Sequence, residues 1–148
     1  MTPKILSLDP YLAPYTDDIA LRIANFKSAR KRLIPKNGAL SDFANGHHYF
    51  GLHRAVGGWV YREWAPAAEA MYLTGDFNGW DRHQYKLEKM ENGVFEIFIP
   101  GIHTLQNGQR YCAIVVHDGK ELDRIPAYAT YVVQDENDHS WNAVVHHM

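Results

Sequence analysis

The sequence predicts a mainly β protein: an immunoglobulin-like β-sandwich preceded by an N-terminal helical segment. Two observations lead to this prediction. Apolar residues recur at helical spacing early in the chain, whereas residues 47–148 form short β-type runs separated by turn residues. Seven or eight such runs without helices between them are typical of two packed antiparallel sheets rather than of an α/β sheet. We therefore expect a helical segment at 1–46 and a sandwich at 47–148.

The helical segment carries its own start and stop signals. Thr16 is placed to cap a helix, and Asp17 and Asp18 suit the positive end of its dipole. Pro35 stops the helix, because proline has no N–H to donate and clashes with the preceding turn. The last turns are basic and we interpret them as a solvated helix end, since four cations are few for a nucleic-acid arm. These cations are Lys27, Arg30, Lys31 and Arg32.

The second part of the chain begins after a short helix, expected at 41–46 with Ser41 as its cap and Gly46 as its terminator. Two tight-turn signals, Gly57-Gly58 and Asp118-Gly119, then indicate hairpins. The last run is expected to close an edge of a sheet. The expected strands lie in HHYFGLHRAV, WVYREWAP, AMYLTGDF, VFEIFIP, QRYCAIVVH, KELDRI, TYVVQ and SWNAVVH.

Composition excludes several classes of function. The 148 residues contain no apolar run of the roughly 18 residues that a membrane helix needs. The apolar residues of the N-terminus are interrupted by Asp9, Pro10 and Pro14, unlike those of a signal peptide. With a net charge of −2, the chain also lacks the basic footprint of a nucleic-acid binder. We expect a cytoplasmic protein that binds neither membrane nor nucleic acid.

Metal and cofactor chemistry are not expected either. The single cysteine, Cys112, lies among apolar residues and is expected to be a buried, inert thiol. The histidine pairs His47-His48 and His146-His147 are adjacent, so on a strand each pair supplies only one ligand to a site. No HExxH motif and no phosphate-cradling glycine loop occurs. The sequence therefore predicts no metal and no cofactor.

Two carboxylates are candidates for glycoside chemistry, which needs a pair of them across the bond. Asp76 follows a strand end, where a short acid usually hydrogen-bonds the backbone of a turn. Glu63 shares one face of its strand with Trp59 and Tyr61, which favours a cross-strand pairing. We therefore assign no catalytic residue.

Aromatic chemistry is the stronger signal. In LTGDFNGWDRHQY, Trp80 stands at the tip of a turn, where an indole can stack on the apolar face of a sugar ring for about 1 kcal/mol. The alternative, a ring folded back onto the rim of the sandwich, stays open. Trp59, Trp64 and Trp141 lie inside strand patterns and are expected to be core or interface rings.

A family resemblance sharpens this interpretation. The run FGLHRAVGGWVYREWAPAAEAMYLTGDFNGW, residues 50–80, resembles the N-terminal region of eukaryotic-type 1,4-α-glucan branching enzymes. The likeness continues upstream through DPYLAPYTDDIALRIANF and SDFANGHHYFGLHR, and downstream through GVFEIFIPG and RIPAYATYVVQD. It covers residues 9–137. FNGW also occurs in other starch-active proteins, whereas DPYL together with EWAPAAE narrows the resemblance to branching enzymes.

The resemblance implies a helical segment, a β-sandwich of carbohydrate-binding module family 48, and then a catalytic (β/α)8 barrel of glycoside hydrolase family 13. Such an enzyme cleaves α-1,4 linkages and forms α-1,6 branches in glycogen. The barrel's catalytic patterns are absent from this chain, so we expect no branching by the chain alone. The implied partners are α-glucan and the barrel. A surface meant for the barrel is expected to be exposed and to permit self-association.

Two alternatives remain beside a glucan-binding and barrel-docking role. One is a structural module that positions the barrel without binding glucan. The other is a free-standing glycogen-binding scaffold subunit.

The resemblance also implies site residues. Trp80 matches the family's sugar-stacking tryptophan, Asn78 lies in the same motif, and Asn92 and Gly93 flank a further glucan site. Related glycogen-binding modules use a lysine and a second tryptophan, and their places here fall at Cys112 and the Glu121-Leu122 pair. This departure removes half of the usual aromatic clamp.

Overall fold

The computed structural model describes residues 3–34 and 36–146, and the chain forms two compact units that divide between Gly46 and His47. The first unit is helical. No residue of its helices is buried, so these helices form no core of their own. Its elements are α1 (Ile5–Leu8), η1 (Pro10–Tyr15), α2 (Thr16–Leu33) and α3 (Leu40–Phe43), where η denotes a 3-10 helix.

The ends of these helices differ from the sequence prediction. Thr16 is the first residue of α2 rather than its cap, because η1 runs directly into α2 and the Thr16 hydroxyl donates to the Ala13 carbonyl. Ser41 lies inside α3, where the Asp42 carboxylate instead accepts from the N–H of Ala39, the residue before the helix. Both predicted caps are therefore wrong.

Of the two predicted helix ends, the first is close to the observed end and the second is wrong. α2 ends at Leu33, close to the expected stop, and Pro35 itself lies outside the described residues. Gly46 does not terminate α3, which already ends at Phe43. It begins the short 3-10 helix η2 (Gly46–His48). No helix in residues 3–34 and 36–146 has both the length and the apolar character needed to cross a membrane.

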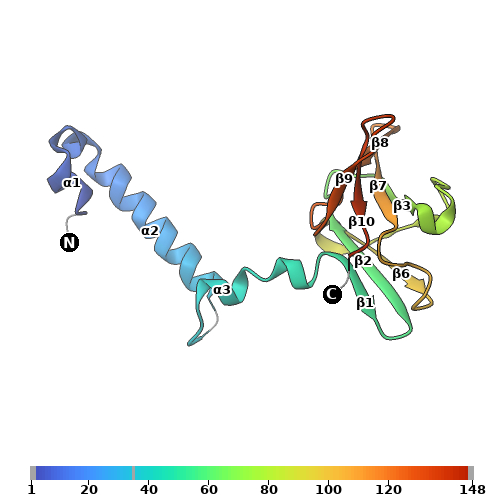
Figure 1. Cartoon of the computed structure of the whole chain (residues 1–148). Helices are drawn as coiled ribbons and strands as arrows, with labels where there is room; N and C mark the ends of the chain where they lie inside the picture. Colours follow the sequence, from blue (N-terminus) through green and yellow to red (C-terminus); the bar gives the residue numbers. More distant parts are fainter. Residues whose placement is uncertain (1–2, 35, 147–148) are drawn as a thin grey trace. The chain divides into compact units, whose positions relative to one another are not determined.

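The second unit is a β-sandwich of two antiparallel sheets, which confirms the predicted fold class (Figure 1). One sheet has the order β1-β2-β6-β5. The other has the order β4-β3-β7-β10-β9, with β8 also paired to β7. The strands are β1 (Gly51–Ala55), β2 (Gly58–Trp64), β3 (Ala70–Gly75), β4 (Tyr85–Lys86), β5 (Glu88–Lys89), β6 (Val94–Pro100), β7 (Arg110–His117), β8 (Lys120–Arg124), β9 (Val132–Gln134) and β10 (Trp141–Val144).

Three details of the strand prediction are wrong. The first hairpin turns at Val56-Gly57, because Ala55 already pairs with Gly58. β10 pairs with both β7 and β9, so the last expected strand lies inside the sheet rather than at its edge. β4 and β5 were not expected, since two residues are too few to show an alternating pattern.

Inward side chains of both sheets form the core, as period-two alternation requires. Trp59 is buried as expected, but Trp64 is 59% exposed and Trp141 is 53% exposed, so neither is a core ring. Trp64 lies an odd number of residues after Trp59 on β2, so its side chain belongs to the outward face of the strand. The core residues are Trp59, Tyr61, Ala68, Met71, Leu73, Leu87, Phe95, Ile99, Leu105, Tyr111, Ala113, Ala143 and Val145.

Glu63 is buried on the same face as Trp59, as the alternation predicts. Its carboxylate accepts hydrogen bonds from the Tyr61 hydroxyl at 2.8 Å and from the Ala127 backbone N–H at 3.1 Å. Burial, reinforced by this carboxylate, raises the pKa of Tyr61 well above its ordinary value. Glu63 therefore fastens the segment after β8 to the core.

Candidate functional site

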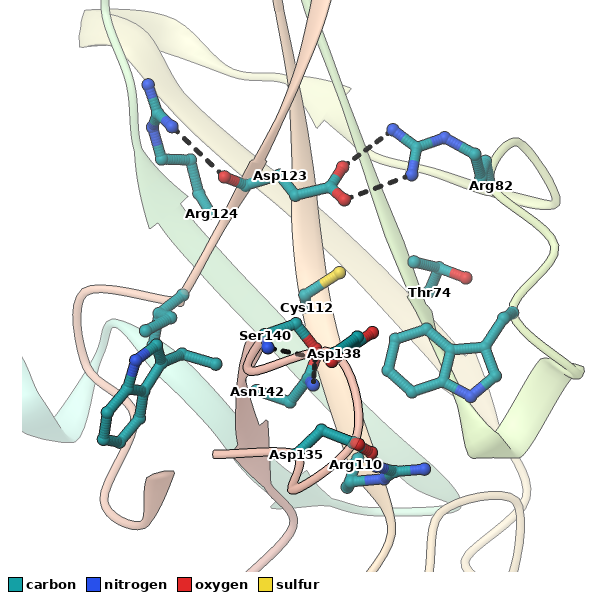
Figure 2. Close-up of a pocket in the computed structure, with 13 residues that line it drawn as sticks. Thr74, Arg82, Arg110, Cys112, Asp123, Arg124, Asp135, Asp138, Ser140 and Asn142 are labelled. Atoms are coloured by element: carbon teal, nitrogen blue, oxygen red, sulfur yellow. Dashed lines mark hydrogen bonds and ion pairs between the residues drawn. The ribbon is translucent and has the colours of Figure 1, made fainter. Parts of the chain in front are cut away.

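A pocket opens in the second sheet, where one edge of β7 changes its partner from β10 to β8. β10 pairs with β7 at Arg110 and Tyr111, whereas β8 pairs with the same edge of β7 from Ala113 onward. Cys112 lies at this change of partner, and a cavity of about 830 Å³ opens over it (Figure 2). The cavity is lined by Thr74, Trp80, Arg82, Arg110, Cys112, Asp123, Arg124, Ile125, Asp135, Asp138, Ser140, Trp141 and Asn142.

The floor of the cavity is a row of three small side chains. Thr74 on β3 pairs directly with Cys112 on β7. Because Ala143 pairs with Tyr111, Asn142 of β10 continues the row on the other side of Cys112. All three residues are buried. Burial, strengthened by the Asp123 charge and opposed by that of Arg82, raises the pKa of the Cys112 thiol to about 11, so the thiol is neutral near pH 7.

The walls are charged but balanced. Three arginines and three aspartates line the cavity. Arg82 donates to Asp123 at 2.7 Å and, outside the lining, to Glu121 at 3.1 Å, while Arg110 pairs with Asp135. Figure 2 shows Asp123 between Arg82 and Arg124, whose side chain donates to the Asp123 backbone carbonyl. A cavity in which cations and anions cancel suits a neutral, polar ligand better than an ion.

Trp80 is held in place by its own turn. After η3 (Asp76–Asn78), Gly79 and Trp80 both take positive φ, at 62° and 63°. The Trp80 indole N–H donates to the Asp76 carboxylate at 2.9 Å, and the Arg110 guanidinium lies 5.9 Å from the ring centroid. A left-handed bulky residue costs roughly 1–2 kcal/mol, and such strain often marks a functional position. The ring is half-buried and lines the cavity.

Asp76 and Asn78 build this turn. The second oxygen of Asp76 accepts from the Arg110 backbone N–H at 2.7 Å, the backbone role expected of it. The Asn78 amide oxygen accepts from Gly75 N at 3.0 Å, and its amide nitrogen donates to the Asp81 carbonyl at 2.8 Å. Asn78 thus positions Trp80. A direct contact between Asn78 and sugar stays a prediction.

Asn92 and Gly93 lie elsewhere. They belong to η4 (Glu91–Gly93), between β5 and β6 of the other sheet, and neither lines the cavity. The Asn92 carbonyl accepts from the Trp64 indole at 2.9 Å, and Gly93 packs against Pro66. The structure therefore brings Trp80 and Asn78 together and leaves Asn92 and Gly93 apart. A glucan site at this second turn stays a prediction.

Sequence reasoning missed most of the cavity. Arg110, Trp141 and Asn142 line it, and none of the three was predicted as a site residue. The one local pattern that could have indicated them is the adjacent tryptophan and asparagine in SWNAVVH. Cys112, the place of the related lysine, does lie in the floor. Leu122, near the place of the second tryptophan, does not line the cavity.

A second cluster of potential ligands sits at the β7–β8 turn. Glu69, His117 and Asp118 place one ligand atom each within 4.8 Å of one another, and all three are exposed. His117 Nδ1 donates to the Ala67 carbonyl, and the Glu69 carboxylate accepts from the Asp118 N–H at 2.8 Å. These hydrogen bonds account for the geometry without an ion.

The profile of the family Carbohydrate-binding module 48 (Isoamylase N-terminal domain) matches residues 49–129, more than half of the chain. The chain is 38% identical over 141 residues to the 1,4-alpha-glucan-branching enzyme of Yarrowia lipolytica, covering 91% of the chain and 20% of that enzyme. It is 37% identical over 135 residues to that of Solanum tuberosum, covering 88% and 16%. The chain thus spans about a fifth of these relatives.

Solved structures agree on the fold. Pullulanase type I from Bacillus subtilis, complexed with maltose, gives a TM-score of 0.51 at 17% identity. The match covers 79% of this chain and 14% of the pullulanase chain. Pullulanase from Anoxybacillus sp. LM18-11, complexed with maltotetraose, gives 0.53 at 14% identity, covering 80% and 15%. From the profile match and the relatives, the chain belongs to the carbohydrate-binding module 48 family and is homologous to one region of 1,4-α-glucan-branching enzymes.

Proposed function

We propose that the sandwich binds α-glucan in the cavity at Trp80. The observation that carries this proposal is an indole held by its turn beside a cavity whose charges cancel. A pyranose offers an apolar face to such a ring and hydroxyls to the polar lining. A charged ligand would meet no net opposite charge here. Neutral sugar is therefore the ligand class that this lining fits best.

Polar groups around Trp80 supply partners for the sugar's rim. The side-chain amide N–H of Asn142 donates to the Ser140 hydroxyl at 3.3 Å. The side-chain oxygen of Asn142 accepts no hydrogen bond from the described residues. Arg82 and Arg110 are ion-paired, yet each guanidinium has further N–H groups to donate. Single contacts of this kind are weak. On a polymer with many equivalent sites, linking the module to a second glucan-binding part raises the overall affinity above that of one contact.

We further propose that this binding serves a longer branching protein. The curated relatives are about five times longer than the matched region, and their names state the branching of 1,4-α-glucan. The chain would hold glucan near a catalytic barrel that cleaves α-1,4 linkages and forms α-1,6 branches, in the cytoplasm. No catalytic role is assigned to this chain's own residues.

A second candidate function is docking without glucan binding. The outward face of the first sheet exposes Trp64 (59%) on β2 and Phe98 (50%) on β6. Between them Arg62 pairs with Glu96 across the two strands. Exposed apolar side chains of this size favour a protein contact. A module that only positions the barrel would use this face and leave the Trp80 cavity empty.

The test is a titration of the chain with maltoheptaose and with glycogen, followed by tryptophan fluorescence. Trp80→Ala should weaken maltoheptaose binding at least about fivefold, the loss of one stacked ring. Trp64→Ala is the matched control, since Trp64 is an exposed tryptophan outside the cavity. If the unaltered chain binds neither ligand, the glucan proposal fails and the docking role is favoured. An equal loss in both variants would also contradict a site centred on Trp80.

A further inference from the structure

Trp141 lines the same cavity as Trp80 but comes from the opposite side of β7. Trp80 follows β3, and Trp141 is the first residue of β10. β3 and β10 are the two neighbours of β7 in the order β3-β7-β10. The floor row of Thr74, Cys112 and Asn142 therefore runs between the two elements from which the tryptophans come.

The Trp141 ring has no evident task in the fold. It is 53% exposed, and its side chain makes no hydrogen bond, ion pair or ring contact within residues 3–34 and 36–146. Ile125, which also lines the cavity, is 41% exposed. By contrast the Trp80 indole is anchored by Asp76. An exposed aromatic ring that lines a cavity is placed to contact a ligand there.

The spacing of the strands sets the size of that ligand. Neighbouring strands lie about 4.8 Å apart, so β3 and β10 are separated by about 10 Å. A short ligand stacked on Trp80 therefore stays on the β3 side of the cavity, whereas a longer run of the same chain can cross the floor row and contact Trp141. The volume of about 830 Å³ is near the upper end of pockets that bury a drug-sized ligand, at roughly 300–1,000 Å³, which leaves room for more than one sugar.

We propose that Trp141 is a second stacking platform, so that the cavity holds an α-glucan oligosaccharide bridging Trp80 and Trp141. This inference rests on the proposed glucan binding and adds a subsite to it. The second tryptophan that related modules carry after their Asp-Gly turn is absent here, where Glu121 and Leu122 stand. A ring on β10 supplies an aromatic wall from a different strand. Two linked contacts bind a long chain more tightly than either binds a short one.

The test compares ligand lengths. Maltose and maltoheptaose are titrated calorimetrically into the unaltered chain, Trp80→Ala, Trp141→Ala and the control Trp64→Ala. Trp141→Ala should weaken maltoheptaose about fivefold and leave maltose binding unchanged, because a disaccharide on Trp80 does not reach the second ring. Trp80→Ala should weaken both ligands. Trp64→Ala should weaken neither.

The outcomes separate the two proposals. If the unaltered chain binds no maltoheptaose, the glucan proposal itself fails and the inference with it. If Trp80→Ala weakens binding and Trp141→Ala does not, only the second platform is overturned.

Two further measurements keep the inference testable if Trp141→Ala folds poorly. Trp141→Phe keeps an aromatic face and should retain most of the maltoheptaose affinity, and a loss equal to that of the alanine variant would contradict stacking. In the unaltered chain, the indole N–H resonance of Trp141 should move with maltoheptaose and stay fixed with maltose. A resonance that stays fixed with both ligands would overturn the inference.

Discussion

The Trp80 turn and the Asn92 turn are built alike and end in different places. Each follows a strand, contains a short 3-10 helix and takes positive φ at two successive residues. In the Trp80 turn the second residue with positive φ is Trp80 itself, whose indole lines a cavity. In the Asn92 turn it is Gly93, which packs against Pro66, while the Asn92 carbonyl holds the Trp64 indole.

This difference teaches that two similar turns can present different groups: one places a side chain beside a cavity, and the other packs its backbone against a proline. The sequence predicted glucan contacts at both turns from one resemblance. The Trp80 turn aims a side chain into space between strands, whereas the Asn92 turn closes a space between its own glycine and a proline. Four changes sharpen or break this contrast.

The largest effect is expected from Gly93→Ala. An added Cβ would lie 2.5 Å from Pro66 Cα, and φ is +76°. A left-handed alanine costs roughly 1–2 kcal/mol and overpacking roughly 1–3, so the free energy of unfolding should fall by about 3 kcal/mol. Urea denaturation measures the change.

Gly79→Ala is the matched control from the Trp80 turn. Its φ is similar, at +62°, but an added Cβ meets nothing within 4 Å. Only the conformational cost should appear, about 1 kcal/mol. Equal losses in the two variants would contradict a tight contact between Gly93 and Pro66.

The next effect concerns Asp76. Its carboxylate accepts from the Trp80 indole and from the Arg110 backbone N–H. Asp76→Ala removes both hydrogen bonds and should lower the free energy of unfolding by about 1–2 kcal/mol. It should also weaken maltoheptaose, because the Trp80 ring loses its anchor. Asp76→Asn, with one carboxyl oxygen fewer, should lie between the alanine variant and the unaltered chain in both measurements. Unchanged glucan affinity in a folded Asp76→Ala protein would show that the ring needs no anchor.

The sandwich could be predicted because its signals are local. Alternation in β2 placed Trp59, Tyr61 and Glu63 on one face, and the tight turn at Asp118-Gly119 joins β7 to β8 as expected. Helix caps failed for a local reason too. η1 continues into α2, so Thr16 had no free helix end to cap.

Most of the candidate site could not be predicted, because it depends on which strands become neighbours. Trp141 and Cys112 are far apart in the sequence and line one cavity only because β10 pairs with one end of β7 and β8 with the other. A strand pattern shows which residues share a face but not which strand lies next to it. Trp80 was found from the sequence because its turn is a continuous motif.

A smaller effect is expected at the Asn92 turn from Trp64→Phe. The change keeps a ring but removes the indole hydrogen bond to the Asn92 carbonyl. Trp64 is 59% exposed, so the loss should be about 1 kcal/mol or less in urea denaturation, with glucan affinity unchanged. Weaker maltoheptaose binding by this variant would place glucan at the Asn92 turn as well.

The smallest effect is a difference in pH response between the two indoles. The backbone N–H of Asn137 and the Arg110 guanidinium hold the pKa of Asp135 below its ordinary value. Because this native pKa is lowered, the contact of Asp135 with Arg110 is present above about pH 4 and is lost as pH falls through the native value. Arg110 lies over Trp80, so acid should disturb that indole. The Asn92 carbonyl that holds Trp64 does not titrate.

The measurement follows both indole N–H resonances from about pH 6 to about pH 3, a range that spans the ordinary carboxyl pKa values. The Trp80 signal should move and the Trp64 signal should stay, with the two signals assigned from their absence in Trp80→Ala and in Trp64→Phe. Asp135→Asn, which cannot titrate, should reduce the movement of the Trp80 signal. If both indoles move together while the protein stays folded, the two turns share one electrostatic environment, and the contrast between a held, cavity-lining ring and a closed turn is lost.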